Sequence, residues 1–364
     1  KGAACCARRP APSDRHGPHH PRRPVPRPQG GTAHSRITPS WPAVTSTVPS
    51  GEKATASTSA RPPAIRLTTG PEQPMPPDIN ILIAGRPARE QLTASPALHT
   101  LVIPWAGLPP ETRLLLAEFP HIATHNLHHN AQPVAEMVLT LLLSAAKLVV
   151  PFDRRLREDD WRPRYRPSPA VLLSGKTALI LGYGAIGRHT AAYCQALGMR
   201  VLATRRRSLP AAGGPADEVH PATELARLLP QATALLICLP HTPETDGLIG
   251  GAELGLLPEK AVLVNVGRGP IVDEAALFAA LQSGRLHSAG LDVWYNYPAD
   301  VDSRSHTPPA NHPFQTLDNV VMSPHRAGAT ASSNRLRMTH LAALLNAVAT
   351  EEVLPNRIDL AAGY

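Results

Sequence analysis

Thr177-Ala-Leu-Ile-Leu-Gly-Tyr-Gly-Ala-Ile-Gly187 joins an apolar strand to a glycine-rich turn, and a helical pattern follows as far as Gly198. A second strand is expected at Met199–Thr204. In such a turn the first glycine allows the tight bend, the second lets the backbone approach a pyrophosphate and the third lets the helix pack on the strand. The N–H groups at the start of the helix attract the anion. A purely structural turn is the alternative. The predicted cofactor contacts are Gly182, Gly184, Ala185, Ile186 and Gly187.

Three arginines, Arg205-Arg206-Arg207, follow the second strand. NAD sites usually carry an acidic residue here, about 20 residues past the glycines, to bind the ribose hydroxyls. A guanidinium group instead binds phosphate through forked, charge-assisted hydrogen bonds. The sequence therefore predicts contacts from Arg205 and Arg206 to a 2′-phosphate and a preference for NADP, with NAD as the alternative. A solvated arginine run is the structural alternative.

Residues 1–78 differ in composition from the rest of the chain. They hold sixteen of the 41 prolines and eleven Lys or Arg against four Asp or Glu, and they lack a periodic apolar pattern. Such a segment cannot bury a core, so we expect a disordered tail. The excess of positive charge lies in this tail without a recognisable binding module, which argues against a nucleic-acid partner. Because Met75 precedes the first convincing strand, translation is expected to begin near it, or the upstream reading frame to be in error.

The 364 residues suffice for two domains. Four cysteines without Cys-x-x-Cys spacing fit a reducing compartment, so a cytoplasmic protein is expected. The longest apolar run, Val134–Val150, contains Glu136 and Lys147 and is typical of a buried helix, so no membrane span is expected.

Beyond Thr177 short apolar strands alternate with helical patterns, which predicts an α/β fold with a Rossmann-type, doubly wound parallel sheet. Ligands of open α/β sheets bind at the carboxyl ends of the strands. A smaller substrate domain, flavodoxin-like and truncated, is expected before it, with strands at Ile79–Ala84 and Thr100–Ile103. The expected division is a tail at 1–78, a substrate domain at 79–132, a dinucleotide-binding domain at 133–328 and a C-terminal helix at 329–364 that returns to the substrate domain.

Several motifs occur in one order along the chain. They are Val134-Ala-Glu136, Gly182–Gly187, Leu239-Pro-His-Thr-Pro-Glu-Thr-Asp-Gly-Leu-Ile249, Val264-Asn-Val-Gly-Arg-Gly-Pro-Ile-Val-Asp-Glu274, Gly290-Leu-Asp-Val293 and Pro324-His-Arg-Ala-Gly328. Together they resemble the D-isomer-specific 2-hydroxyacid dehydrogenase family, over roughly residues 79–354. The resemblance implies a substrate domain that begins with a further strand-helix-strand segment, and the composition of the proline-rich tail argues against its supplying that segment.

The resemblance assigns the chemistry to two residues. Arg268, in the Asn-x-x-Arg-Gly motif, would hold the substrate carboxylate and polarise its carbonyl, and His325, in the Pro-His motif, would deliver the proton. A surface salt bridge for the arginine and a helix cap for the histidine are the structural alternatives. The further cofactor contacts implied are Leu239, Pro240, Val266, Gly267 and Asp292.

The substrate contacts implied by the resemblance come from earlier in the chain. The loop Trp105-Ala106-Gly107 stands where the family offers backbone N–H groups to the substrate carboxylate, and Trp105 would also line the site. Asn130, four residues before Val134, matches a position that is asparagine in several branches of the family.

One departure from the family pattern affects the proton donor. The family pairs its histidine with a glutamate, but the corresponding position is Tyr297. A neighbouring carboxylate raises the pKa of a histidine and keeps it protonated, so His325 is expected to be a weaker donor. Asp300 or Asp302 is a candidate substitute, although a solvated loop is the favoured interpretation.

Four histidines, His121, His125, His128 and His129, raise the question of a metal site. The proline and asparagines around them instead predict a strand end and a polar loop, so no metal is expected.

These features predict an NADP-preferring oxidoreductase that interconverts a small 2-oxoacid and its D-2-hydroxyacid, as glyoxylate and hydroxypyruvate reductases do. Formate oxidation is one alternative, because formate dehydrogenases of this family also lack the glutamate. A catalytically weak NADP(H) sensor is the other. The resemblance implies a homodimer, and the individual substrate is not readable from the sequence.

Overall fold

The computed structural model describes residues 65–67, 75–206, 214–350 and 352–363 of the chain. Within these residues the backbone forms two entirely parallel sheets, one of seven strands and one of four. Of the tail predicted at residues 1–78, residues 1–64 and 68–74 lie outside the described residues, and so does Arg207.

The seven-stranded sheet has the strand order β11-β10-β9-β8-β5-β6-β7. Its strands are β5 (Thr177–Leu181), β6 (Arg200–Arg205), β7 (Glu218–Pro221), β8 (Ala234–Ile237), β9 (Ala261–Asn265), β10 (Leu286–Leu291) and β11 (Val320–Met322). The order reverses between β5 and β8, as in Rossmann folds, where ligands bind beside the strand at the reversal. The predicted doubly wound parallel sheet is confirmed.

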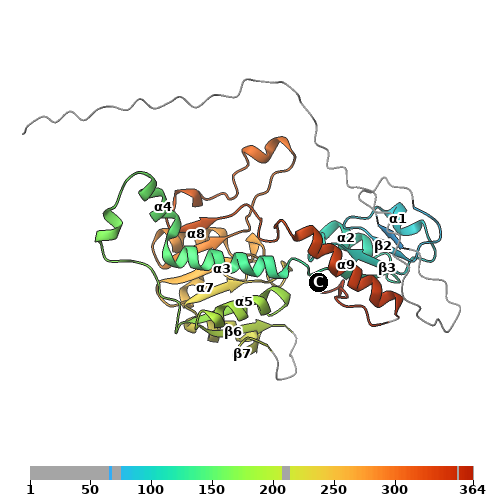
Figure 1. Cartoon of the computed structure of the whole chain (residues 1–364), viewed down its shortest axis with the longest axis horizontal. Helices are drawn as coiled ribbons and strands as arrows, with labels where there is room; N and C mark the ends of the chain where they lie inside the picture. The colour runs from blue at the N-terminus through green and yellow to red at the C-terminus, as the bar shows by residue number, and fades with distance from the viewer. Residues whose placement is uncertain (1–64, 68–74, 207–213, 351, 364) are drawn as a thin grey trace, which may run out of the picture. The chain divides into compact units, whose positions relative to one another are not determined.

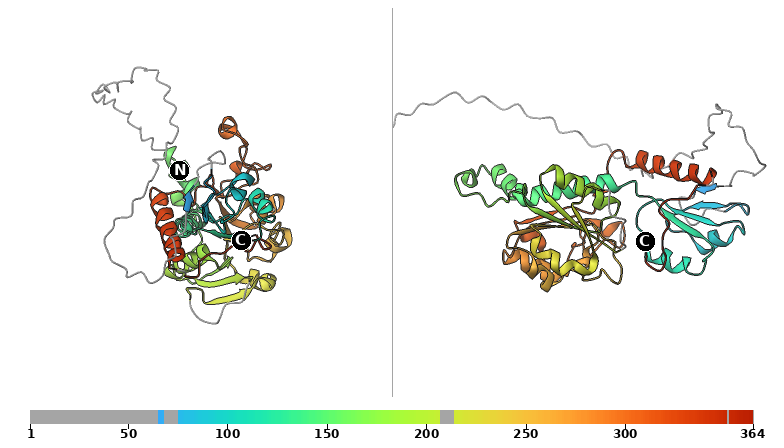
Figure 2. Two further views of the ribbon diagram at one scale, coloured as in Figure 1. Left: turned by 90° about the vertical axis from the view of Figure 1, so that its right-hand side faces the viewer. Right: turned by 90° about the horizontal axis from the view of Figure 1, so that it is seen from below.

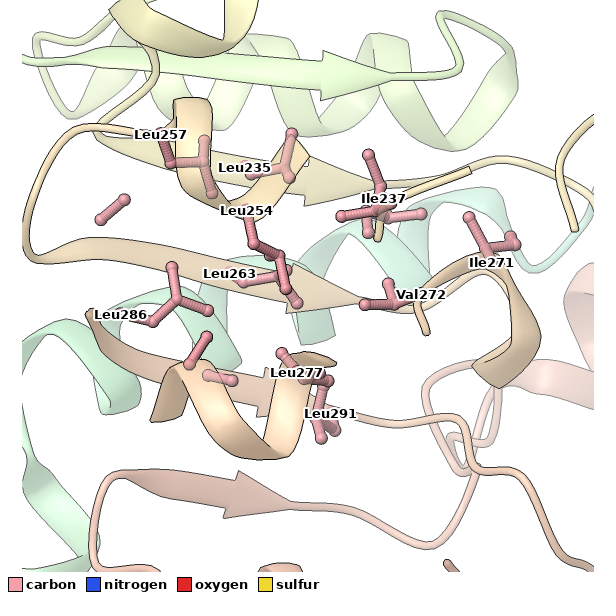
Figure 3. Close-up of a cluster of buried hydrophobic side chains, with 14 of the residues drawn as sticks. Leu235, Ile237, Leu254, Leu257, Leu263, Ile271, Val272, Leu277, Leu286 and Leu291 are labelled. Atoms are coloured by element: carbon pink, nitrogen blue, oxygen red, sulfur yellow. The ribbon is translucent and has the colours of Figure 1, made fainter. Parts of the chain in front are cut away.

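Helices cover both faces of this sheet (Figure 1). On one face α3 (Ala131–Lys147) and α5 (Ala185–Ala196) pack together over the strands. The other face is covered by α7 (Gly251–Leu256) and α8 (Glu274–Gln282), whose leucines interdigitate with Leu235, Leu263 and Leu291 (Figure 3). Each fully buried leucine contributes roughly 1.5–3 kcal/mol to folding. The strands are therefore held in place by packing on both faces of the sheet.

The four-stranded sheet has the order β1-β2-β3-β4. Its strands are β1 (Ile65–Leu67), β2 (Ile81–Ile83), β3 (Thr100–Ile103) and β4 (Ala123–Asn126), with the short helices α1 (Arg89–Thr93) and α2 (Pro110–Leu116) between them. The buried leucine and isoleucine side chains of β2 and β3 form its core with those of neighbouring loops.

β1 corrects two expectations about the start of this sheet. Ile65–Leu67 pair in parallel with Ile81–Ile83 and Met75 packs on the core, so the predicted tail does not extend uniformly to residue 78, and the proline-rich region does supply a strand. Three residues between prolines are too short for a periodic pattern to reveal a strand.

The predicted helix Val134–Val150 is divided in the structure. α3 ends at Lys147, Leu148 takes a left-handed conformation with φ of 53°, and α4 (Val149–Arg157) continues at an angle of 64°. Pro151 accounts for the break, because its ring would clash with the carbonyl of Lys147, four residues earlier, and it has no N–H to donate. Among the described residues no single helix is long and apolar enough to cross a membrane; α3 and α4 meet that criterion only as a bent pair.

The C-terminal helix α9 (Ser333–Ala349) lies beside the four-stranded sheet in both views of Figure 2. Leu341 and Leu344 are buried against Ile81, Ile83 and Val102. Residues near the beginning and near the end of the described chain therefore share one hydrophobic core.

Candidate functional site

The glycine-rich turn after β5 has the geometry that dinucleotide binding needs. Gly182 has φ of 96°, a conformation that favours glycine, and a Cβ there would lie 2.9 Å from the Cys238 carbonyl oxygen. A Cβ on Gly187 would lie 2.1 Å from the Gly182 carbonyl oxygen, so only glycine lets α5 start so close to β5. By contrast, a Cβ on Gly184 would have no heavy atom within 4 Å. The space in front of the α5 N-terminus is therefore open, which fits a pyrophosphate.

Ala185 and Ile186 are the first two residues of α5, so their N–H groups lie at this end of the helix. The residue between the two glycines, Tyr183, points into the protein and is only 2% exposed. Its hydroxyl accepts a hydrogen bond from the Ala216 backbone N–H at 3.0 Å. The backbone N–H groups of Gly182 and Tyr183 both donate to the Thr204 carbonyl, next to Arg205. Tyr183 thus connects the glycine turn with both ends of the β6–β7 connection.

The predicted phosphate-binding arginines lie at the carboxyl end of β6. Arg205 is its last residue and is half-buried, whereas Arg206 is exposed. Among the described residues no hydrogen-bond partner holds the Arg205 guanidinium. The pKa of Glu244 is lowered by hydrogen bonds from Thr242 and the backbone and, to a smaller extent, by the charges of Arg206 and Arg113. Arg206 therefore shares its surroundings with a carboxylate.

The loops after β8 and β9 approach each other closely. A Cβ on Gly267 would lie 2.5 Å from the Leu239 carbonyl oxygen, so the motif glycine is required here. Val266 is buried and donates its N–H to Ile237, while Pro240 is exposed and its carbonyl accepts the Thr245 hydroxyl at 2.8 Å. These predicted contact residues therefore lie along one edge of the sheet, beside the glycine turn.

Asn265 shapes the loop that presents Arg268. Its side-chain amide donates to the Arg268 carbonyl at 2.9 Å, and its side-chain oxygen accepts the Gly267 N–H at 3.0 Å. Asn265 is 2% exposed, so its role is to fix the loop, while the Arg268 side chain is exposed. Sequence reasoning had quoted this asparagine only as part of the motif; its position two residues before a glycine, at a strand end, was the available signal.

Asp292 fixes the loop that carries His325. Its buried carboxylate accepts hydrogen bonds from the Ser323 hydroxyl at 2.5 Å, the Arg326 N–H at 2.9 Å and the Ala327 N–H at 3.0 Å. Between these anchors His325 takes the left-handed conformation, with φ of 55°. A non-glycine residue at such φ is uncommon and persists only where the surroundings hold it. Asp292 therefore supports the loop; the sequence had predicted it as a cofactor contact.

Arg268, His325 and Tyr297 are brought together. The ring centroids of Tyr297 and His325 are 5.6 Å apart. The His325 side chain is still accessible to solvent, but surrounding atoms displace enough water to lower its pKa, and the charge of Arg268 lowers the pKa further, against an opposite effect of Asp292. Arg268 also acts on Tyr297, whose pKa is raised mainly by partial burial.

Tyr297 does not replace the missing glutamate. Its hydroxyl accepts the Trp294 backbone N–H at 3.2 Å, and only its ring faces His325. Asp300 does not replace the glutamate either, because its carboxylate accepts the Ser303 N–H at 2.8 Å within the exposed insertion. Among the described residues no carboxylate is hydrogen-bonded to the imidazole of His325.

The residues predicted to contact substrate lie after β3 and before α3. The Trp105 indole packs on Gly85, where a Cβ would lie 1.8 Å from the ring, and the Ala106 carbonyl accepts the Asn126 amide at 2.7 Å. A Cβ on Gly107 would lie 3.3 Å from the Arg268 guanidinium. The Asn130 side-chain oxygen is buried and has no hydrogen-bond partner among the described residues, and a Cβ on Gly328 would lie 3.2 Å from its amide nitrogen.

The four histidines form no metal site among the described residues, where no suitable group of His, Cys, Asp or Glu is found. His125 lies in β4, which agrees with the predicted strand end, and it binds the Pro355 carbonyl at 2.8 Å. Three of the four residues of this strand, Ala123-Thr-His-Asn126, are buried although the sequence is polar.

Comparison with known proteins agrees with this geometry. Residues 139–327 match the family described as D-isomer specific 2-hydroxyacid dehydrogenase, NAD binding domain. The chain is 38% identical over 237 residues to a glyoxylate reductase from Aeropyrum pernix, which covers 63% of the chain and 66% of that protein. It is 35% identical over 241 residues to glyoxylate/hydroxypyruvate reductase B from Enterobacter sp., with 65% and 68% covered. The matches thus span about two thirds of each relative.

Two solved structures share the fold. One is a D-isomer specific 2-hydroxyacid dehydrogenase from Xanthobacter autotrophicus in complex with NADPH and MES, with a TM-score of 0.64, 27% identity and coverage of 79% of this chain and 86% of that one. The other is a glyoxylate/hydroxypyruvate reductase from Sinorhizobium meliloti in complex with NADP and malonate, with a TM-score of 0.61, 26% identity and the same coverage. Residues 139–327 form an NAD(P)-binding domain. The chain belongs to the D-isomer specific 2-hydroxyacid dehydrogenase family.

Proposed function

We propose that this protein reduces a small 2-oxoacid to the D-2-hydroxyacid with NADPH. The observation that carries the proposal is the convergence of an exposed cation, Arg268, and an accessible imidazole, His325, beside a glycine turn open to a pyrophosphate. The relatives named as glyoxylate and hydroxypyruvate reductases support the substrate class.

The chain offers a place for each part of the reaction. The turn Gly182–Gly187 would hold the pyrophosphate, and the dinucleotide would lie along the loops after β8 and β9, where Leu239, Pro240 and Gly267 are found. The cofactor supplies the hydride when it is bound. Arg268 pairs with the substrate carboxylate, helped by N–H groups of the Trp105–Gly107 loop, and this pairing orients the keto group. Asn130 supplies a further polar contact.

His325 donates the proton to the carbonyl oxygen as the alkoxide forms. The charge of Arg268 lowers the pKa of His325 in the free protein. A substrate carboxylate on Arg268 cancels part of that charge, so substrate binding itself favours the protonated imidazole. Asp292 acts by positioning the loop, and Tyr297 covers one side of the ring without exchanging a proton.

The preference for NADPH rests on Arg205 and Arg206 at the end of β6. Arg205 has no hydrogen-bond partner among the described residues, which leaves its guanidinium available to a 2′-phosphate. Glu244 lies near Arg206 and is the residue that would oppose a phosphate there. The solved structures with NADPH and NADP support the assignment for the family.

A second candidate is a cofactor-binding sensor with weak catalysis. The observation that favours it is the absence, among the described residues, of a carboxylate bonded to His325, since Tyr297 stands at that position. Formate oxidation is the other activity compatible with this substitution, because it requires no proton transfer to an alkoxide. Binding of NADPH without turnover of any 2-oxoacid or of formate would favour the sensor.

Replacement of Arg268 tests the proposal directly. Arg268→Ala should lower kcat/KM for glyoxylate by at least roughly a hundredfold, because a charge-assisted contact to the reacting group is lost. Arg304→Ala, an exposed arginine in the insertion, is the matched control and should retain parental activity. An Arg268→Ala enzyme as active as the control would refute the assignment.

A further inference from the structure

Four basic side chains outside the site described above gather where β4 leads into α3. We call His128, His129, Arg337 and His340 the histidine–arginine cluster. Leu127 is buried against Leu341 of α9, and His128 and His129 directly follow Leu127 in the chain. On α9, Arg337 precedes Leu341 by four residues and therefore lies on the same helix face, while His340 follows Arg337 by three residues and so lies beside it. The apolar part of this face is covered by the small sheet, and its polar part meets the two histidines.

Buried polar atoms in the cluster have no hydrogen-bond partner in the described structure. They are Nδ1 of His129 and Nε of Arg337, and the adjacent Asn130 contributes its side-chain oxygen. His129 is only 7% exposed. Leaving a buried donor unpaired costs about 1–3 kcal/mol. Several such atoms within one cluster indicate a place where a ligand supplies the missing partners.

The charges in the cluster are of one sign. The pKa of His129 is lowered to about 4, mainly by burial and in addition by the charges of Arg337, His340 and His128. Burial and His340 lower the pKa of His128 in the same way. No carboxylate among the described residues forms an ion pair with Arg337. An arginine held beside imidazoles, without an acid, lacks the counter-charge that semi-buried guanidinium groups normally have.

The cluster adjoins the proposed substrate site through Asn130. A Cβ on Gly328 would lie 3.2 Å from the Asn130 amide nitrogen, and Gly328 is three residues from His325. The half-buried His128 and exposed His340 leave the cluster accessible.

From this arrangement, and resting on the proposed function, we infer that the histidine–arginine cluster binds an anionic group at the distal end of the substrate. The preferred substrates are then 2-oxoacids that carry a second carboxylate or a phosphate. Arg268 pairs with the carboxylate next to the keto group, and Arg337 pairs with the distal group. The Nδ1–H of His129 donates to the same group in the neutral tautomer, so no charge need be created on this buried ring.

Matched substrates test the inference. Kinetics with 2-oxosuccinate and 2-oxoglutarate are compared with those of 2-oxobutanoate and 2-oxopentanoate, which replace the distal carboxylate by a methyl group. The parent enzyme should prefer the dianionic member of at least one pair.

Arg337→Gln should reduce that preference by roughly tenfold or more, as expected for a lost hydrogen bond to a charged group, and Arg337→Lys should retain part of it. Arg335→Gln, an exposed arginine on the same helix, should leave it unchanged.

Equal kcat/KM for both members of each pair, or equal losses for both in Arg337→Gln, would overturn the inference.

The unfolding midpoint gives a readout that does not need turnover: 2-oxoglutarate should raise it more than 2-oxopentanoate does, in the parent but not in Arg337→Gln. This shift without turnover of any 2-oxoacid would refute the proposed function and leave the anion site standing. A shift with inorganic phosphate but none with 2-oxoglutarate would assign the cluster to a free anion and contradict its role in substrate binding.

Discussion

His325 combines an unusual backbone conformation with an unusual electrostatic environment. Its φ of 55° is held by the hydrogen bonds of Asp292 to the next two residues, so the loop and not the histidine determines where the imidazole lies. Partial desolvation and Arg268 both lower its pKa. The glutamate that would raise this pKa in the family pattern is absent. Tyr297 stands at its position, and the Tyr297 hydroxyl accepts a hydrogen bond from the Trp294 N–H.

The pH dependence of reduction follows from this environment. The protonated imidazole is the active form, so kcat/KM for glyoxylate should be highest at low pH and fall as pH rises through the pKa of His325, below the ordinary value for histidine. Tyr297→Glu adds a carboxylate beside the ring, raises the pKa and should move the fall to higher pH. Tyr297→Phe keeps the ring contact and should leave the profile where it is. A profile that does not move in Tyr297→Glu would contradict the assignment of His325 as the proton donor.

At the level of elements, the glycines of the turn between β5 and α5 have different roles. Gly187 is required for packing, whereas Gly184 leaves open space. Gly187→Ala would place a methyl group 2.1 Å from the Gly182 carbonyl oxygen, so the free energy of unfolding should fall by about 1–3 kcal/mol. Gly184→Ala meets no atom within 4 Å and should unfold at the parental denaturant concentration, yet bind NADPH more weakly, because its methyl group occupies the cofactor's space. Urea unfolding and cofactor titration measure the two effects. Equal stability of both variants would contradict this division of roles.

Tyr183 gives the same turn a second function, since its hydroxyl holds Ala216 at the far end of the β6–β7 connection. Tyr183→Phe should raise KM for NADPH by roughly three- to tenfold, the effect of one hydrogen bond. KM for NADH and kcat should change less, because the proposed partner of Arg205 and Arg206 is the 2′-phosphate, which NADH lacks. Tyr193→Phe, on the helix α5 that follows the turn, is the matched control. Equal changes in KM for both cofactors would show that the hydrogen bond between Tyr183 and Ala216 has only a structural role.

The sequence predicted the elements with a strong apolar pattern and missed those without one. The central strands of the large sheet are fully buried, and their apolar runs made them visible. β7 (Glu218–Pro221) is a largely exposed, polar edge strand, and β1 has three residues, so neither has a detectable pattern. The division of the long helix at Leu148 depended on Pro151, which a count of apolar residues does not register.

The same limit applies to the candidate site. Ordered motifs predicted which residues carry the chemistry, but their interactions depend on residues distant in sequence. Asp292 accepts hydrogen bonds from a loop that lies 31–35 residues later in the chain, and Tyr297 contacts His325. Both interactions depend on the folded arrangement of β10 and β11.

For the molecule as a whole, the apolar side chains of both sheets are buried in hydrophobic cores. The segment that follows α4, by contrast, presents large side chains to solvent. Trp161 is 59% exposed and Tyr165 79%. Exposed aromatic residues are enriched at protein–protein contacts, so we propose this segment as a contact surface of the homodimer that the family resemblance implies.

The central claim, NADPH-dependent reduction of a 2-oxoacid, is tested most directly by the rate of cofactor oxidation by the full chain. NADPH and NADH are each offered with glyoxylate, hydroxypyruvate, pyruvate and 2-oxoglutarate. The account predicts rapid oxidation of NADPH with at least one of these acids and a kcat/KM for NADPH at least roughly tenfold above that for NADH, as forked arginine contacts to a phosphate imply. Cofactor binding without oxidation, or a clear preference for NADH, would contradict it.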